Sequence, residues 1–194
     1  MSTHPADDAI IAATRTWIEK AVIGLNLCPF AKAAYVKNQV RIVVSHALHL
    51  DGFLEDLDRE LDFLAAANPE DIDTTLLIHP TLLPDFLDFN DFMQIADAAI
   101  EEHGLEGVLQ IASFHPAFQF EGTAPDDISN FTNHAPFPTL HLLREASIER
   151  AVATFPDAEA IYQRNIETLK KLGHTGWQAL WNTESGAADD SGLK

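Results

Sequence analysis

The chain has 194 residues, a formal net charge of −18 and a hydrophobic content of 46%, a combination typical of a globular protein with one domain-sized core. Residues 51–102 contain 15 Asp and Glu but one basic residue, Arg59. Such a surface repels the phosphates of nucleic acids and of anionic membranes. Nucleic acid and membrane are therefore excluded as expected partners.

The sequence shows no export signal and no membrane-spanning segment. Residues 1–8 lack a basic region and an apolar core, and no apolar run approaches the roughly 18 residues that cross a bilayer. The single cysteine, Cys28, cannot form an intramolecular disulfide, which suits a reducing compartment. We therefore expect a cytoplasmic protein.

Apolar periodicity predicts helices and strands in alternation. The first helix is expected over about residues 7–25, with Gly24 at its end. Aliphatic runs predict strands over residues 40–46, 74–79 and 107–113. Helical spacing predicts the connecting helices over residues 51–67, with Asp51 as the N-cap, and 85–103.

A strand, a helix and a further strand in succession form a βαβ unit, in which the two strands run parallel. The sequence therefore predicts an α/β fold with a small, mostly parallel sheet and flanking helices. One domain is expected over residues 1–182, followed by a disordered polar tail over residues 183–194. Trp177 and Trp181 are expected to dock on the body of the domain, or to form a contact in a homo-oligomer.

Residues 114–138 show no helical or strand period, and they contain four prolines and five phenylalanines. An irregular stretch of this length is typical of a functional loop, and the phenylalanines indicate that it packs against the domain. Residues 118–120 are an alternative short strand. Thr139 is then predicted to cap a helix over residues 140–155, and Pro156 to begin another that ends at Gly173.

The three predicted strands end at His46, His79 and His115. Because parallel strands end at one edge of a sheet, the three imidazoles are expected to meet there, where open α/β folds bind ligands. They can hold Zn²⁺ or Fe²⁺, with Glu121 or Asp126 of the long loop as an oxygen ligand, or act as acid, base and anion binder. The alternative is that each histidine caps its strand by a hydrogen bond to a nearby carbonyl.

Two further side chains are candidate catalytic residues. Cys28 lies before a proline at the end of the first helix and can present a thiol in a cleft, although a lone cysteine is commonly a small buried hydrophobe. Arg144 is one of only 12 Lys and Arg and can clamp a carboxylate or phosphate. Its alternative role is a surface ion pair with a neighbouring glutamate.

Polar side chains in and after the long loop are candidates for contact with a substrate. Amides and histidines precede a predicted helix N-terminus, which attracts anions. The candidate substrate-binding residues are Glu121, Asn130, Asn133, His134 and His141. Glycine-rich nucleotide-binding motifs and the G-x-S-x-G motif of hydrolases are absent from the sequence.

Several longer motifs resemble a single family. These motifs are Asn26-Leu-Cys-Pro-Phe-Ala31, Leu77-Ile-His-Pro80, Phe89-Asn-Asp-Phe92, Phe114-His-Pro-Ala-Phe-Gln-Phe-Glu-Gly122 and the run from Thr132 to Glu145. Over about residues 8–172 the chain resembles a mainly bacterial family catalogued as domain of unknown function 1415. The resemblance implies no particular activity, cofactor or catalytic residue.

The leading functional hypothesis is an enzyme that acts on a small anionic molecule. Its site would lie at the carboxyl edge of the sheet and would use hydrolytic or proton-transfer chemistry, with Zn or Fe as an optional cofactor. The alternative is a ligand-binding or protein-interaction module without catalysis. In that case the phenylalanine-rich loop and the two tryptophans would form the contact surface.

Overall fold

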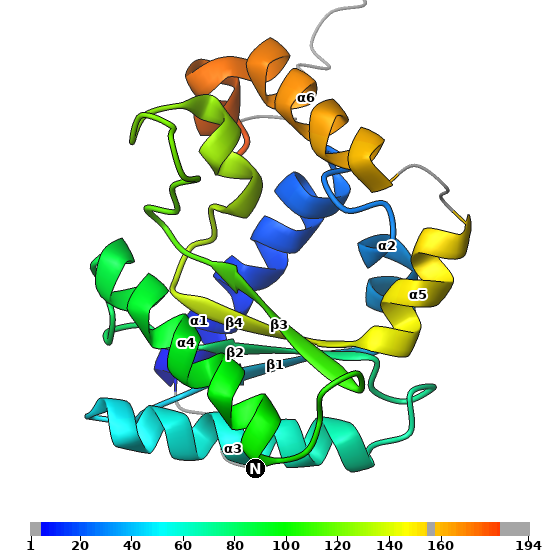
Figure 1. Ribbon diagram of the computed structural model, residues 1–194. Coiled ribbons are helices and arrows are strands. Elements are labelled where there is room, and N and C mark those ends of the chain that lie inside the picture. Colours follow the sequence, from blue (N-terminus) through cyan, green and yellow to red (C-terminus); the bar gives the residue numbers. More distant parts are fainter. Residues whose placement is uncertain (1–4, 155–157, 183–194) are drawn as a thin grey trace, which may run out of the picture.

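A four-stranded sheet separates two layers of helices in the computed structural model, which describes residues 5–154 and 158–182 (Figure 1). The elements in chain order are α1 (Pro5–Trp17), η1 (Ile18–Ile23), α2 (Ala31–Val36), β1 (Val40–Val44), α3 (Leu50–Ala66), β2 (Thr74–Ile78), α4 (Phe86–Glu102), β3 (Leu109–Phe114), η2 (Ile128–Asn133), β4 (Thr139–Arg144), α5 (Glu145–Thr154) and α6 (Ala158–Ala179). The predicted tail and the predicted helix start at Pro156 lie outside the described residues.

The strands lie in the order β1-β2-β4-β3. β1 pairs with β2 in parallel, and β4 runs antiparallel to both of its neighbours, β2 and β3. β1, β2 and β3 therefore run in one direction, with β4 inserted against them. The predicted α/β fold with flanking helices is confirmed, but the prediction of a mostly parallel sheet is wrong because the sheet is mixed.

The error traces to residues 139–144, which were predicted to begin a helix. Leu140 and Leu143 have helical spacing with Ser147 and Ala151, and leucine is a good helix former. In the structure these residues form β4, and α5 begins only at Glu145. β4 is covered on both faces, so its leucines are nearly consecutive rather than alternating with polar residues.

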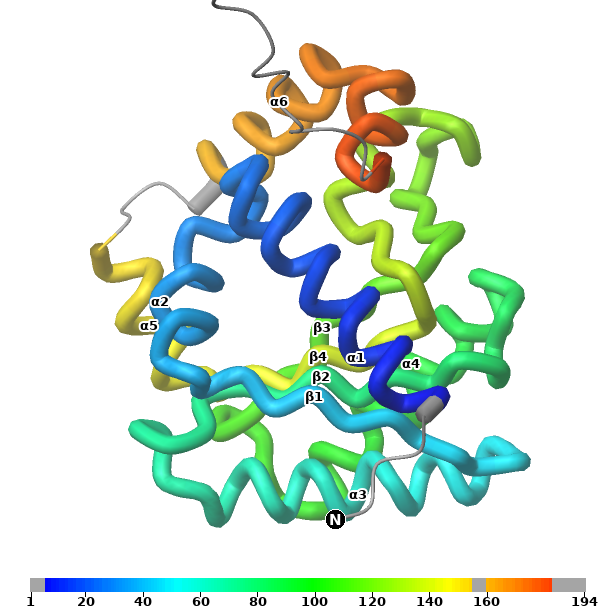
Figure 2. The backbone as a smooth tube through the Cα atoms, turned by 180° about the vertical axis from the view of Figure 1, so that it is seen from behind, coloured from blue at the N-terminus to red at the C-terminus, as the bar shows by residue number. Residues whose placement is uncertain are grey.

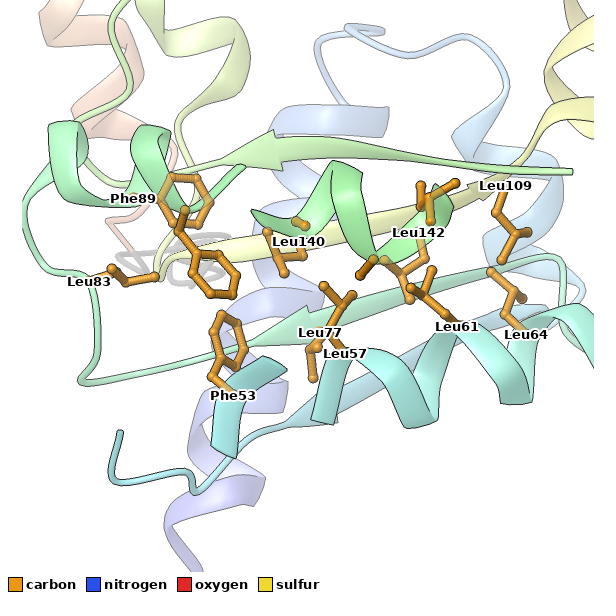
Figure 3. Packing of buried hydrophobic residues seen from close by; sticks show 14 residues of the cluster. Phe53, Leu57, Leu61, Leu64, Leu77, Leu83, Phe89, Leu109, Leu140 and Leu142 are labelled. Atoms are coloured by element: carbon orange, nitrogen blue, oxygen red, sulfur yellow. The ribbon is translucent and has the colours of Figure 1, made fainter. Parts of the chain in front are cut away.

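One face of the sheet packs on α3 and α4 (Figure 1). Every third or fourth residue of α3 from Phe53 to Leu64 is buried, as the helical spacing predicts. Figure 3 shows these side chains pointing at the leucines of β2, β3 and β4. The predicted N-cap Asp51 is wrong, because His49 holds that position. Asp85, in contrast, caps α4 by accepting hydrogen bonds from the N–H groups of Leu87 and Asp88.

The other face is covered by α1, η1, α2 and α5, and α6 lies further from the sheet, where it contacts η2 (Figures 1 and 2). Trp177 is buried there and packs edge-on against Phe131 and Trp181, so the two tryptophans dock on the body as predicted. Gly173, with a φ of 64°, interrupts α6 where the sequence predicts a helix end. No helix within the described residues is long and apolar enough to cross a membrane.

The first helix changes geometry halfway. Residues Ile18–Ile23 form η1, a π-helix, which commonly marks a functional site. It ends at Gly24, where a Cβ atom would collide with the carbonyl oxygen of Lys20. The glycine therefore permits the wide turn that leads into the segment around Cys28.

The long loop packs down as predicted, although residues 118–120 do not form a strand. The Phe118 ring lies 5.1 Å from that of Phe86 and 4.9 Å from that of Phe120. Residues Ile128–Asn133 form the 3-10 helix η2, which contacts α6. The aromatic rings thus fix a loop that has little secondary structure of its own.

An ion pair between α3 and α4 predicts a pH-dependent stability. His103 Nδ1 lies 2.8 Å from Asp62 Oδ1, and its Nε2 lies 3.2 Å from Asp58 Oδ1. The hydrogen bond with Asp62 raises the pKa of His103. Because the folded-state pKa exceeds the unfolded one, the ion pair stabilises fully below about pH 6.5 and is lost as the pH rises through the folded-state pKa.

We therefore expect His103→Gln to lower the free energy of unfolding more at about pH 5.5 than at about pH 8.5, measured by urea denaturation at both values. Asp62→Asn should show the same trend. An equal loss at both pH values would contradict this role of His103.

Candidate functional site

The carboxyl ends of β1, β2 and β3 lie at one edge of the sheet, but the three histidines do not converge on a common point. His46 is exposed, and its Nε2 lies 3.0 Å from a carboxylate oxygen of Asp7 in α1. His79 and His115 are buried. The edge therefore presents one solvated imidazole and two that are enclosed by protein.

His79 uses both ring nitrogens on the backbone. Its Nδ1 accepts hydrogen bonds from the N–H groups of Leu82, at 2.7 Å, and Thr81, at 3.2 Å. Its Nε2 therefore carries the proton and donates to the carbonyl oxygen of Ala47, at 2.8 Å. Burial lowers the pKa of His79, which keeps the ring neutral near pH 7.

His115, which follows β3, also uses both ring nitrogens on the backbone. Its Nδ1 accepts from the N–H of Ala117, and its Nε2 donates to the carbonyl oxygen of Leu83, both at 3.0 Å. Burial lowers its pKa as well. Leu83 has a φ of 55°, a strained value for a bulky residue, and the hydrogen bond from His115 holds its carbonyl in place.

These contacts leave neither buried ring with a free lone pair for a metal. Within residues 5–154 and 158–182, no group of three or more His, Cys, Asp or Glu side chains is placed to hold a metal ion. The expected site for Zn or Fe at His46, His79 and His115, with Glu121 as a ligand, is not assembled. The geometry fits the alternative in which strand-end histidines bind nearby carbonyls.

A comparison of two of these histidines tests their role. We expect His115→Ala to lower the free energy of unfolding by about 3 kcal/mol, because it leaves a cavity and two unpaired backbone groups. His46→Ala should change it by less than about 0.5 kcal/mol, since its ring is exposed. Chemical denaturation measures both, and equal small effects would contradict a structural role for His115.

Arg144 does not lie at the edge where the three histidines were expected to meet. It is buried at the end of β4, where its Nη2 donates to the carbonyl oxygens of Leu64, Ala67 and Ile72 at 2.6, 2.8 and 3.1 Å. Leu64 lies in the last turn of α3 and Ala67 is its C-cap, so the guanidinium neutralises the carbonyl end of that helix. Burial lowers the pKa of Arg144.

We expect Arg144→Met to destabilise the protein by about 3 kcal/mol, because the carbonyl groups at the end of α3 lose a charged donor. Arg59→Met is the matched control, since Arg59 lies on the exposed side of the same helix, and it should cost less than about 0.5 kcal/mol. Urea denaturation compares the two. A loss for Arg144→Met no larger than for the control would contradict this anchoring role.

Three of the predicted substrate-binding residues organise the long loop. Asn130 is fully buried and binds the backbone of Phe120 and Ala124. Asn133 donates to the carbonyl of Ser113. His134 binds the carbonyl of Phe118, and burial lowers its pKa.

Glu121, the fourth of these residues, lies exposed in the same loop. The hydrogen bonds that hold this loop come from Asn130, Asn133 and His134 rather than from Glu121.

The fifth predicted residue, His141, lines a cavity of about 380 Å³ on the sheet face that carries α1 and α5. The sheet forms one wall, and η1, α2 and α5 form the others. The lining is mainly apolar and consists of Trp17, Ile18, Val22, Cys28, Phe30, Ala31, Ala34, Val40, Asp73, Thr74, Leu76, Gln110, Ala112, Phe114, His141, Leu143, Arg144, Ser147, Ile148 and Ala151. Figures 1 and 2 show α2 and α5 side by side on this face of the sheet.

His141 is held in the middle of this wall. β4 places it between Leu76 of β2 and Ala112 of β3. Its Nε2 lies 2.7 Å from the hydroxyl oxygen of Thr74, which also lies 2.6 Å from the carbonyl oxygen of Leu142. Burial lowers the pKa of His141 to about 4, so the ring is neutral near pH 7.

Cys28 and Arg144 line the same cavity, so three predicted site residues, Cys28, His141 and Arg144, border one space. Thr74, the first residue of β2, and Asp73 before it also line the cavity and were not among the predicted site residues. A strand over 139–144 would have pointed to Thr74, because side chains on one face of paired strands are neighbours.

The fold is thus an α/β arrangement with a mixed sheet and a ligand-sized, mainly apolar cavity beneath its helices. A family model described as a protein of unknown function (DUF1415) matches residues 9–179. The chain belongs to that family, as its motifs predict. The search of curated proteins and the search of solved structures each gave no match.

Proposed function

We propose that the protein binds a small, mainly apolar molecule in the cavity lined by His141 and Cys28. The observation that carries the proposal is the size of a space that no side chain of the described residues fills. Protein interiors have few voids larger than a water molecule, whereas ligand pockets begin at about 300 Å³. A cavity of about 380 Å³ falls in the second class.

The helices around the cavity support this proposal. Neither α2 nor α5 has a buried residue, although both border the mainly apolar cavity. They contribute small side chains to the lining, among them Ala31, Ala34 and Ala151. Short helices with small inward residues leave room for a ligand to complete the packing.

The π-helix η1 supports the same location. Ile18 and Val22 of η1 line the cavity, and π-helical turns are frequent at functional sites. The site proposed here therefore lies on a face of the sheet rather than at the edge that the sequence favoured. The strand-end histidines serve the fold in this proposal.

A second candidate is a proton-transfer enzyme in the same cavity. It is favoured by the presence of a neutral imidazole and a thiol in one apolar space. The unprotonated imidazole of His141 has a lone pair for a proton of a bound substrate, and its pKa of about 4 makes it a weak base near pH 7. Binding is common to both candidates, so it is the property to test first.

The uncharged fluorescent probe N-phenyl-1-naphthylamine is suited to this test, because its emission rises in an apolar site. We expect one probe to bind per chain. Ala112→Leu, which places a larger side chain in the cavity from β3, should weaken binding at least about tenfold, as overpacking removes room for the probe.

Ala153→Leu is the control, because it makes the same substitution at an exposed position of α5. It should bind the probe as the wild type does. Absence of binding by the wild type, or equal binding by Ala112→Leu, would refute the proposed site.

A further inference from the structure

The proton on His141 can be placed from its hydrogen-bond partners. The carbonyl oxygen of Leu142 can only accept, so the single hydroxyl hydrogen of Thr74 is donated to it over 2.6 Å. The hydroxyl oxygen of Thr74 must then accept from His141 Nε2 over 2.7 Å. The imidazole is thereby fixed with its proton on Nε2 and a lone pair on Nδ1.

That lone pair has no hydrogen-bond partner among the described residues. Nδ1 lacks a partner in this part of the chain, yet it is not among the fully buried side-chain atoms that lack one, so it is accessible. The ring lines the cavity. The nearest aromatic contact, with Phe114 at 5.9 Å between ring centroids, satisfies no lone pair. Nδ1 is therefore an acceptor that borders the cavity.

The other polar groups of the lining are largely engaged. Asp73 accepts from the hydroxyl of Ser147 at 2.5 Å, and the Nη2 and Nε donors of Arg144 go to backbone carbonyls. Gln110 lies opposite Leu143, on the diagonal from His141. Arg144 is the one Lys or Arg among the described residues of the lining, and its bonds direct the guanidinium to the end of α3, three residues along β4 from His141.

We propose that the ligand is an uncharged molecule with an apolar body and a hydroxyl or N–H group that donates a hydrogen bond to His141 Nδ1. This inference rests on the proposed function and adds the chemical class of the ligand. A neutral acceptor in an apolar wall favours a neutral donor, whereas a carboxylate would bring its charge next to a lone pair and to Asp73. His141 is thus the residue that sets specificity.

Three compounds of similar shape test this proposal by isothermal titration calorimetry at about pH 7: naphthalene, 1-naphthol and 1-naphthoate. We expect 1-naphthol to bind about five- to tenfold more tightly than naphthalene, as one buried hydrogen bond to a neutral acceptor provides. 1-Naphthoate should bind at least about tenfold more weakly than 1-naphthol.

His141→Leu should abolish the preference for 1-naphthol and still bind naphthalene, because leucine keeps the wall apolar. His49→Leu makes the same substitution at an exposed histidine outside the cavity, and this control should keep the preference. Loss of the preference in His49→Leu, or its retention in His141→Leu, would overturn the role of His141. Tightest binding of 1-naphthoate would overturn the ligand class.

The outcome also separates this inference from the proposed function. If naphthalene and 1-naphthol bind the wild type equally well, the cavity is a binding site but the ligand class is wrong. If none of the compounds binds, the proposed function fails as well.

Nitrogen NMR of the wild-type histidine rings provides a second readout that needs no variant. It should show a proton on His141 Nε2 and a shift of Nδ1 on addition of 1-naphthol. A proton on Nδ1 would refute the inference.

Discussion

The carboxyl edge of the sheet depends on two neutral imidazole rings that bind only backbone. His79 joins the end of β2 to the carbonyl of Ala47, after β1. His115 joins the end of β3 to the carbonyl of Leu83, after β2. Since β4 separates β2 from β3, the second link connects two strands that share no ladder of hydrogen bonds. Both rings are buried and have a lowered pKa, so the links persist near neutral pH.

At the opposite edge of the sheet, the guanidinium of Arg144 joins β4 to α3. Arg144, the last residue of β4, binds carbonyls at the end of α3 and in the loop before β2. β4 is therefore fixed by its two neighbours and by this anchor. His141 lies three residues before it on the face away from α3, so its position in the cavity wall follows from restraints that are themselves structural. The cavity is bounded on one side by this restrained sheet and on another by α2 and α5, neither of which has a buried residue.

Much of the fold could be predicted from the sequence because its signals are local. Apolar periodicity placed β1, β2, β3, α3 and α4 within a few residues, and the common direction of the first three strands followed from their connections. β4 could not be found in this way. Its leucines fit a helix, and its insertion between β2 and β3 is a pairing between residues distant in sequence that no local pattern encodes.

The candidate site shows the same limit in more detail. The sequence placed His79 and His115 at the correct edge, but it could not show that their side chains turn back to the backbone. Whether an imidazole faces a ligand or a carbonyl depends on loops such as the one that bears Leu83, whose positive φ has no clear sequence signal. His141 was selected for a helix position that it does not occupy, and its place in the cavity comes from β4.

The charge of the protein bears on what can enter the cavity. The expectation of an anionic ligand relied on the histidines, on a predicted helix N-terminus at residue 139 that the structure replaces by β4, and on Arg144, whose Nη2 is occupied by three backbone carbonyls. A net charge of −18 creates a negative potential that opposes the approach of anions and favours protonation of histidines. The pKa of His141 is nevertheless lowered to about 4 by burial, so desolvation outweighs that field at this position. Desolvation that disfavours the charged form of His141 disfavours other charges at the same place, and this is the reason for proposing a neutral ligand.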